Sequence, residues 1–383
     1  MKKNTLGIDA TNLRHGGGQT HLIEIINSID PNLYGFNRVI IWGNNQLLTQ
    51  IRDFCWLTKI STNFHSGGIL KRVYWQLMHL SSQANSLGCN ILFIPGGIFF
   101  GKFYPVVTIN QNLLPFVWKE IFRYGFSIKF LKLFLIRFLQ IYTFKKANGI
   151  IFLTNAAMSI VKNTTGEIKC KTKIIHHGFN NRFIKIPKEQ FSIDKYSAAN
   201  PYKIIYVSTI DEYKHQNHVV EAISFLRNKT KWPITLDLFG TSGNPKIQKK
   251  LLKAILLHDP KWTWVRLNGS LAYQEIHKVY EKADLGVWAS SCEAFGIILL
   301  EKMASGLPIV STQNDIFKEI LGDSALYFDP EITITISNAI QMYIENPPLR
   351  SLKSEESFLK SGSFTWEKCA HETFKFLSEC INE

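Results

Sequence analysis

Hydrophobic residues follow two alternating patterns along the chain. Short apolar runs of the kind that form buried strands alternate with longer segments in which apolar residues recur at helical spacing. In the first half, strands are predicted at 5–9, 38–42, 91–94, 106–109, 150–153 and 173–176, with amphipathic segments such as 19–29 and 70–87 between them. This alternation predicts a parallel sheet covered by helices, so the fold class is α/β.

The second half repeats the alternation. Strands are predicted at 203–208, 235–239, 265–267, 285–288, 308–311 and 325–328, and helices at 218–227, 246–257, 273–282 and 297–305. A polar stretch without pattern, from Asn180 to Pro201, separates the halves and is interpreted as a linker. Doubly wound sheets bind ligands at the carboxyl ends of their strands, so two facing sheets would hold a ligand in the cleft between them.

Composition narrows the choice of partner. Of 383 residues, 45% are hydrophobic and 19% charged, which excludes disorder as the main state. The formal net charge of +14 indicates an anionic partner: a phosphorylated small molecule, a lipid headgroup or a nucleic acid. Nucleic acid is not expected, because no binding motif or dense basic run accompanies the charge.

The six cysteines are scattered without a C-x-x-C pair, and the first residues form no signal-peptide core. Free thiols and a cytoplasmic protein are therefore expected.

The segment 116–146 contains the most apolar part of the chain, residues 126–144. Lys129, Lys132 and Arg137 interrupt it, so no membrane-spanning helix is predicted. Two interpretations remain open. The segment forms a basic amphipathic surface that lies on an anionic membrane, or it forms a largely buried crossover helix before the strand at 150.

The stretch 289–308 follows the order strand, loop, helix and stop. Gly306 suits a left-handed position after the helix and Pro308 lies just beyond, so the helix is predicted from near Gly296 to near Ser305. Glu293 then lies in the loop and Glu301 about a turn and a half into the helix. Two neighbouring carboxylates would repel phosphate, so they are expected to bind neutral hydroxyl groups, as on a sugar or ribose. Glu293 alone could also be only a helix cap.

This stretch, Ser290-x-x-Glu-x-Phe-Gly-x-x-x-x-Glu-x-Met-Ala-x-Gly-x-Pro, closely resembles the group 1 (family 4) glycosyltransferases. The likeness extends back to Gly269 and forward to Pro330. It implies the GT-B fold, with two facing Rossmann-like domains and a deep interdomain cleft. The implied domains are an acceptor-binding domain at 1–183, a linker at 184–200, a nucleotide-sugar donor domain at 201–363, and a helix at 364–383 that returns to the first domain.

The resemblance also implies roles for individual residues. Glu301 would bind the ribose hydroxyls of the donor, and Glu293 would hold the donor sugar. Lys214 matches the lysine of a basic pair that neutralises the diphosphate, although a solvated loop lysine is the plainer interpretation of it. Thr209 stands where family members carry arginine. The expected catalytic residues are Glu293 and Lys214, and the remaining expected donor contacts are Ser208, Thr209, Gly240, Phe295, Gly296, Ile297 and Glu301.

Two features of the first half complete the expected site. Gly16-Gly17-Gly18 follows a strand and opens a helix, without the spacing of a dinucleotide fingerprint. In the resembling family such a loop approaches the donor phosphates, so Gly17 and Gly18 are expected contacts, although a glycine cluster can also be only a turn.

Gln111 and Asn112 occupy positions where the family often has His-Asp. Neither amide can act as a base, so both are expected to hydrogen-bond donor or acceptor. The pair His176-His177 is not expected to bind zinc, because no further ligand follows at suitable spacing.

The resemblance implies transfer of a hexose-type sugar from a UDP- or GDP-linked donor to a hydroxyl of a lipid-linked oligosaccharide, with retention. The expected setting is O-antigen, lipopolysaccharide or capsule assembly, peripheral to the inner face of the cytoplasmic membrane. The chain lacks Asp-x-Asp, so no metal or other cofactor is expected at the diphosphate. Thr209, Gln111 and Asn112 keep an alternative open: a catalytically inactive protein that binds a nucleotide sugar or polyanion. A nicotinamide dehydrogenase lacks its fingerprint.

Overall fold

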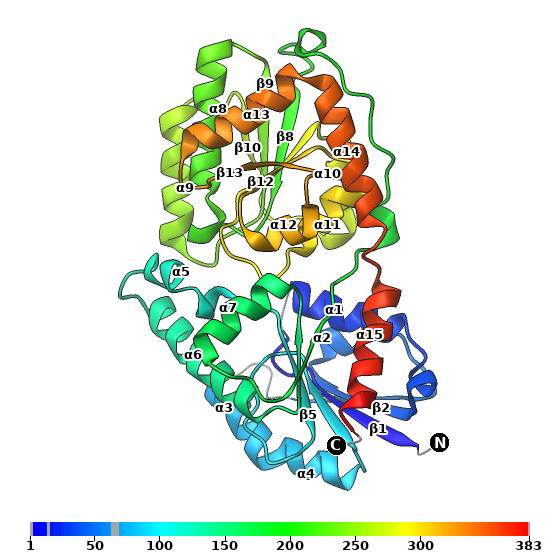
Figure 1. Ribbon diagram of the computed structural model, residues 1–383. Coiled ribbons are helices and arrows are strands. Elements are labelled where there is room, and N and C mark those ends of the chain that lie inside the picture. Colours follow the sequence, from blue (N-terminus) through cyan, green and yellow to red (C-terminus); the bar gives the residue numbers. More distant parts are fainter. Residues whose placement is uncertain (1–2, 14–15, 63–68, 382–383) are drawn as a thin grey trace. The chain divides into compact units, whose positions relative to one another are not determined.

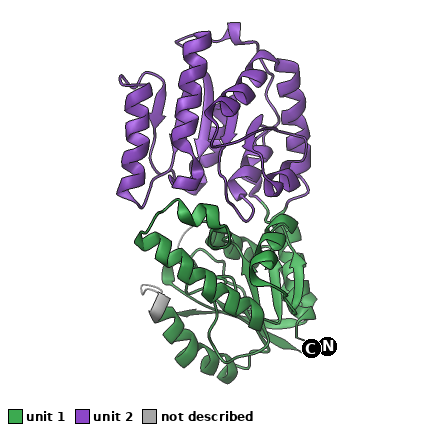
Figure 2. Ribbon diagram, turned by 60° about the vertical axis from the view of Figure 1, so that its left-hand side comes forward, with its two compact units in different colours: residues 1–178, 365–383 green, residues 179–364 purple. Residues whose placement is uncertain are grey.

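The computed structural model describes residues 3–13, 16–62 and 69–381. The chain forms two compact units, residues 1–178 with 365–383 and residues 179–364 (Figure 2). The first unit therefore ends at Gly178 rather than at 183, and it includes the C-terminal helix. Each unit is built around one parallel sheet.

The first sheet has the order β3-β2-β1-β4-β5-β6-β7 (Figure 1). Its strands are β1 (Asn4–Asp9), β2 (Phe36–Gly43), β3 (Leu57–Ser61), β4 (Ile91–Ile94), β5 (Val106–Asn110), β6 (Gly149–Phe152) and β7 (Lys171–Ile174). Its helices are α1 (Gly17–Asn27), α2 (Asn45–Leu48), α3 (Ile69–Trp75), α4 (Ser81–Ser86), α5 (Trp118–Phe122), α6 (Ile128–Lys146), α7 (Asn155–Thr165) and α15 (Trp366–Glu379).

The six strands predicted for this half are confirmed, with ends shifted by up to two residues, but the pattern missed β3. β3 pairs only with β2, at the edge of the sheet, and its residues are half-buried or exposed. Edge strands need little apolar surface, which explains the missing signal. The predicted helix at 70–87 is interrupted by a π turn at Gln76–Leu80, which directs Gln76 inward to donate to Asp9 Oδ2 at 2.9 Å.

The second sheet has the order β10-β9-β8-β11-β12-β13. Its strands are β8 (Tyr202–Val207), β9 (Ile234–Phe239), β10 (Val265–Leu267), β11 (Leu285–Trp288), β12 (Ile309–Thr312) and β13 (Leu326–Phe328). Its helices are α8 (Gln216–Thr230), α9 (Pro245–His258), α10 (Ile276–Lys282), α11 (Ile297–Ala304), α12 (Asp315–Leu321), α13 (Thr333–Glu345) and α14 (Pro347–Ser361). The six predicted strands and four predicted helices of this half are confirmed.

Residues 184–200 pack onto the second unit instead of forming a free linker. The Lys185 amide donates to Ala304 O at 2.9 Å, at the end of α11. Lys188 Nζ donates to Ala283 O at 3.0 Å, and Arg350 Nη2 donates to Phe191 O at 2.6 Å. The stretch is held by hydrogen bonds to backbone carbonyls, which leave no periodic signal in the sequence.

Strand order reverses between β1 and β4 in the first sheet, and between β8 and β11 in the second. At such a reversal the following loops diverge to opposite faces and leave a crevice at the carboxyl ends of the strands. The loop after β8 and the loop at 289–296 after β11 therefore begin side by side.

Gly240 packs the carboxyl ends of three strands closely together. Its φ is 138°, and its amide donates to Gly269 O at 2.7 Å. A Cβ at this position would lie 1.9 Å from Ser208 O. Only glycine allows the chain after β9 to pass this close to the end of β8.

We expect Gly240→Ala to lower the free energy of unfolding of the second unit by about 3 kcal/mol, because it combines an unfavourable φ with a backbone clash. Gly243→Ala is the matched control, since a Cβ there meets nothing within 4 Å. Urea denaturation followed by circular dichroism measures both. Equal stability of the two variants would contradict the close packing.

Candidate functional site

Lys214 and Glu293 form an ion pair at the carboxyl edge of the second sheet. After β8 the chain forms a short 3-10 turn, Glu212–Lys214, which ends at Lys214. Glu293 lies in the loop after β11. Ser290 Oγ donates to the same Glu293 oxygen at 2.9 Å. The reversal of strand order thus brings together the two residues expected to be catalytic.

Two aromatic rings contact the Lys214 side chain, and a hydrogen bond from a tyrosine holds its backbone carbonyl. Its ammonium lies 4.8 Å from the Trp288 ring centroid and 4.9 Å from that of Tyr213. The Tyr206 hydroxyl donates to Lys214 O at 2.6 Å. Lys214 is only 5% exposed, so this ammonium depends on the Glu293 carboxylate for its counter-charge.

A second buried lysine faces Trp288. Lys302 Nζ is 4.8 Å from the Trp288 ring centroid and donates to Val287 O at 2.8 Å. Burial, and then the nearby charge of Lys214, lower the pKa of Lys302 to about 7. Lys302 was not among the expected site residues. The sequence signal that could have indicated it is a charged residue inside the otherwise apolar run of α11.

Glu301 is buried without a matching donor. Within the described part of the chain, neither carboxylate oxygen accepts a well-formed hydrogen bond. Burial raises the pKa of Glu301 to about 8, and the Tyr273 hydroxyl and Arg182 guanidinium oppose that rise. A ligand that supplies hydroxyl donors would satisfy this carboxylate, as the sequence analysis expects.

Arg182 and Tyr273 are further site residues that the sequence analysis missed. The Arg182 guanidinium stacks on the Tyr273 ring with 4.2 Å to its centroid. Its Nε and Nη2 are buried and make no hydrogen bond to any described residue. Arg182 and Glu301 are thus oppositely charged neighbours, and each has polar atoms that make no well-formed hydrogen bond to a described residue. No periodic pattern marks Arg182, which lies in the stretch interpreted as a linker.

Glu293 and Glu301 have different neighbours. Glu293 contacts Lys214 and Ser290, whereas Glu301 lies near Tyr273 and Arg182. The sequence analysis expected both carboxylates to face one ligand. The structure gives them separate surroundings, so they would contact different parts of it.

The start and end of α11 depend on glycine, as predicted. Gly296 precedes the helix with φ 101° and has no side chain to cap it, and Gly306 follows with φ 63°. The Phe295 side chain is buried and packs on Phe364, with ring centroids 6.0 Å apart. At Phe295 and Gly296, only backbone groups can therefore contact a ligand. Ile297, the third expected contact, is the first residue of α11.

The loop after β8 holds the remaining expected donor contacts. The Ser208 amide donates to Phe239 O at 2.9 Å, beside Gly240. Thr209 is exposed, and its carbonyl accepts from Gln216 Nε2 at 2.8 Å. His215 is buried with Nε2 3.1 Å from Ser291 Oγ, so it does not replace the missing arginine as an exposed cation.

In the first unit, Gly18 and Gln111 meet. A Cβ on Gly18 would lie 2.8 Å from Gln111 Oε1, while Gln111 Nε2 lies 3.3 Å from His21 Nδ1. Gly17 begins α1. Part of the glycine-rich loop, residues 14–15, lies outside the described residues. Asn112 Oδ1 accepts from the Leu114 amide at 3.1 Å and so caps a local turn.

Comparison with known proteins identifies the second unit. Residues 188–358 match the model of the family described as glycosyl transferases group 1. They form a group 1 glycosyl transferase domain. O-antigen chain mannosyltransferase B of Escherichia coli is 25% identical over 181 residues, 47% of each chain. O-antigen chain mannosyltransferase RfbU of Salmonella typhimurium is 23% identical over 206 residues, 54% of this chain and 53% of that one. The chain thus spans about half the length of these curated relatives.

Solved structures establish the fold of the whole chain. HepE from Anabaena, solved in complex with UDP-glucose, has a TM-score of 0.71 at 17% sequence identity and covers 98% of this chain and 99% of its own. The two helix-flanked parallel sheets therefore form the GT-B fold of glycosyltransferases, as expected.

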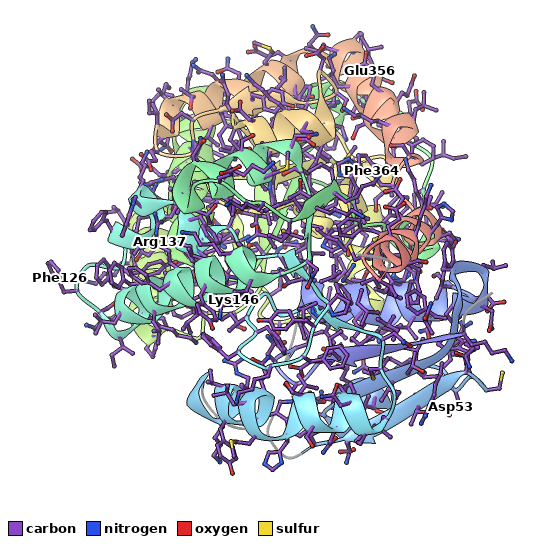
Figure 3. The ribbon with its side chains drawn as sticks, turned by 60° about the horizontal axis from the view of Figure 1, so that its bottom comes forward. Asp53, Phe126, Arg137, Lys146, Glu356 and Phe364 are labelled. Atoms are coloured by element: carbon purple, nitrogen blue, oxygen red, sulfur yellow. The ribbon has the colours of Figure 1, made fainter. Side chains whose placement is uncertain are left out.

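Outside the glycosyl transferase domain, α5 and α6 expose an apolar surface. We define the α5–α6 surface by its exposed large side chains: Trp118, Phe122, Phe126, Ile128, Leu131, Phe134, Leu135, Phe138 and Tyr142. The inward face of α6 includes Arg137, Gln140 and Thr143. Figure 3 shows Phe126 standing out from this segment, with Arg137 and Lys146 further along α6. Of the two open interpretations, the crossover helix holds in part: α6 lies between β5 and β6 and buries one face, but it is not largely buried. Among the described residues, no helix is long and apolar enough to cross a membrane.

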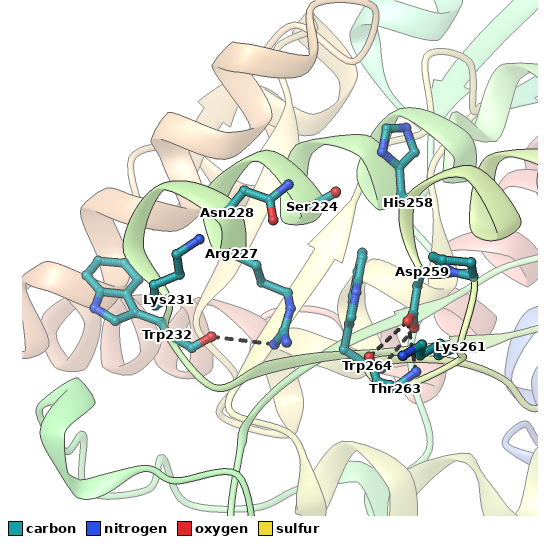
Figure 4. A pocket seen from close by; sticks show the side chains of 11 residues that line it. Ser224, Arg227, Asn228, Lys231, Trp232, His258, Asp259, Lys261, Thr263 and Trp264 are labelled. Atoms are coloured by element: carbon teal, nitrogen blue, oxygen red, sulfur yellow. Dashed lines mark hydrogen bonds between the residues drawn. The ribbon is translucent and has the colours of Figure 1, made fainter.

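A hollow in the glycosyl transferase domain lies near the amino ends of β9 and β10 (Figure 4). Arg227 there donates to the carbonyls of Ile234 and Trp232, and Asp259 accepts from the Thr263 and Trp264 amides. Its main charged groups already bind the backbone, and it lies at the opposite end of the strands from Lys214. It is therefore not the candidate site.

We expect Glu301→Gln to raise stability at alkaline pH. The unfolded carboxyl ionises near 4.5 and the folded one near pH 8, so the wild type loses stability as pH rises through this window. The variant has no such loss. At pH 8 it should be more stable by about 2 kcal/mol or more, with little difference at pH 4.5.

Urea denaturation at the two pH values tests this expectation. Glu345→Gln, at an exposed glutamate of α13, is the control and should change neither value. A pH-independent difference between Glu301→Gln and the wild type would contradict the buried, unsatisfied carboxylate.

Proposed function

We propose that this protein transfers a hexose-type sugar from a nucleotide-diphosphate sugar to a hydroxyl acceptor, with retention. One observation carries the proposal: in the glycosyl transferase domain, the paired Lys214 and Glu293 lie at the same strand edge as the loop and helix that hold the unsatisfied Glu301. A ligand with phosphates, sugar hydroxyls and ribose hydroxyls offers a partner to each of these groups.

Donor binding would exchange the partners of the ion pair. A diphosphate oxygen competes with Glu293 for the Lys214 ammonium, and the released carboxylate then accepts from hydroxyls of the donor sugar. The first amides of α11 add donors that no side chain caps. Ribose hydroxyls donate to Glu301. Thr209 contributes no charge, and burial leaves Lys302 only partly protonated near neutral pH, so stabilisation of the leaving group would depend chiefly on Lys214.

In the reaction we propose, the bond from the anomeric carbon to the diphosphate oxygen breaks while the acceptor oxygen bonds that carbon from the same face. The departing phosphate oxygen takes the acceptor proton, so no enzymic base is required. Lys214 and the helix amides stabilise the charge that develops on the diphosphate. This chemistry requires no divalent cation at the diphosphate, and Gln111 and Asn112 would only orient hydroxyls.

The relatives suggest the setting. Two of them are O-antigen chain mannosyltransferases, and HepE binds UDP-glucose. We therefore propose a UDP- or GDP-linked donor and a lipid-linked oligosaccharide acceptor in O-antigen, lipopolysaccharide or capsule assembly. The α5–α6 surface, together with exposed Lys132, Lys145 and Lys146, would hold the protein on the inner face of an anionic cytoplasmic membrane.

Lys214→Met should reduce kcat on the order of 10² to 10³ with the active donor, because it removes the cation at the leaving group. The assay screens UDP- and GDP-sugars for release of the nucleotide diphosphate. Lys249→Met, at an exposed lysine of α9, is the control. Activity of the wild type should persist in EDTA and gain nothing from manganese or magnesium.

If the protein binds a donor but shows no turnover with any acceptor mixture, the result would instead support the inactive binding protein that Thr209 suggests. Loss of activity in EDTA with rescue by manganese would overturn metal independence at the diphosphate.

The double variant Phe126→Ser with Ile128→Ser should bind anionic vesicles at least about tenfold more weakly than the wild type. These side chains are 99% and 87% exposed, and burying each in lipid is worth roughly 1.5–3 kcal/mol. Flotation with phosphatidylglycerol vesicles at low salt measures the binding. Leu359→Ser, at an exposed leucine of α14, is the control. Failure of the wild type to float would discard the membrane proposal.

A further inference from the structure

Three potential metal ligands converge inside the first unit. His21 lies on α1, His177 follows β7 and Cys369 lies on α15. One ligand atom from each lies within 4.8 Å of the other two. The three residues are 0%, 3% and 1% exposed, so the group is enclosed by the unit and separate from surface histidines or acidic clusters.

We propose that His21, His177 and Cys369 form a binding site for Zn²⁺ that fastens the C-terminal helix to α1. Two imidazoles and one thiolate are ligand types that zinc prefers, and a water would take the fourth tetrahedral position. With bonds of about 2.0–2.3 Å, tetrahedral ligand atoms lie roughly 3.3–3.8 Å apart, so side-chain shifts of about 1 Å close the site. Cys369 would release its thiol proton to solvent on binding, and both histidines would bind as neutral rings.

The orientation of His21 supports the site. Its Nδ1 lies 3.3 Å from the Gln111 side-chain amide, whereas its Nε2 makes no hydrogen bond within the described residues. Nε2 is therefore the atom available to a metal. With the Gln111 amide turned so that its oxygen accepts from Nδ1–H, Gln111 would orient the ligand as outer partners of zinc-bound histidines do.

The rings around the group complete a closed site. The His21 and His177 ring centroids are 4.7 Å apart, and the Trp366 ring lies 6.1 Å from the first and 5.6 Å from the second. α1 packs against α15 beside them. None of the three proposed metal ligands is an expected substrate contact, although Gln111, which is one, lies against His21. The proposal does not depend on the proposed function.

Cobalt(II) titration of the full chain tests the site directly. The background carries Cys55→Ser, which removes an exposed thiol. We expect one Co²⁺ per chain, a thiolate-to-cobalt charge-transfer band in the near ultraviolet, tetrahedral d–d bands, and displacement of Co²⁺ by Zn²⁺. Cys369→Ser should remove the charge-transfer band and weaken metal binding at least tenfold.

Cys380→Ser is the matched control, because Cys380 is a buried cysteine at the end of the same helix, and it should keep the band. Persistence of the band in Cys369→Ser would overturn the proposal. If Cys369→Ser does not fold, the titration of the Cys55→Ser protein decides the question. Absence of a charge-transfer band at excess Co²⁺ in that protein also overturns the proposal. Neither outcome touches the transferase proposal, whose assay measures nucleotide release.

Discussion

A buried ammonium needs a counter-charge, and in the glycosyl transferase domain this requirement links two loops that begin at neighbouring strands. Lys214 is 5% exposed, and Glu293 is its ion-pair partner. Removing either group would leave the other charge unpaired, which costs far more than an exposed ion pair is worth. The Ser291 amide, which donates to Tyr213 O at 2.8 Å, holds the same two loops by their backbones. The pairing is possible only because strand order reverses between β8 and β11.

The same edge contains two buried ionisable side chains, and the carboxylate oxygens of one of them, Glu301, accept no well-formed hydrogen bond from a described residue. Glu301 and Lys302 are neighbours in α11, and burial moves both pKa values toward neutrality, to about 8 and about 7. Apolar residues at both positions would pack without a desolvation penalty. Stability of the helix alone therefore does not explain two buried ionisable side chains here. A buried carboxylate such as Glu301, without a well-formed hydrogen bond to a described residue, is typical of a binding site, where a ligand completes the hydrogen bonds.

Sequence patterns predicted the elements and the local signals well. Gly296 and Gly306 limit α11 as predicted. Lys214 and Glu293, which the family resemblance singled out, form an ion pair that the sequence did not predict. Patterns could not reveal β3, a half-exposed edge strand, or the inward turn of Gln76 at a π turn. Arg182, Lys302 and the group of His21, His177 and Cys369 also escaped. Their chemistry arises from neighbours distant in sequence, which no spacing rule connects.

Helix α6 inverts the usual relation between polarity and burial. Its inward side places Arg137 where it donates to Pro115 O at 3.1 Å, and Thr143 where it accepts from the Phe99 amide at 2.9 Å. These hydrogen bonds satisfy the polar side chains of an inner face that also buries Leu133 and Phe144. Other aromatic residues of α6, among them Phe134 and Phe138, are exposed, as are Trp118 and Phe122 of α5. A helix that only covered a sheet would bury its phenylalanines and expose its arginine. Exposed apolar patches of this kind are typical of interaction surfaces.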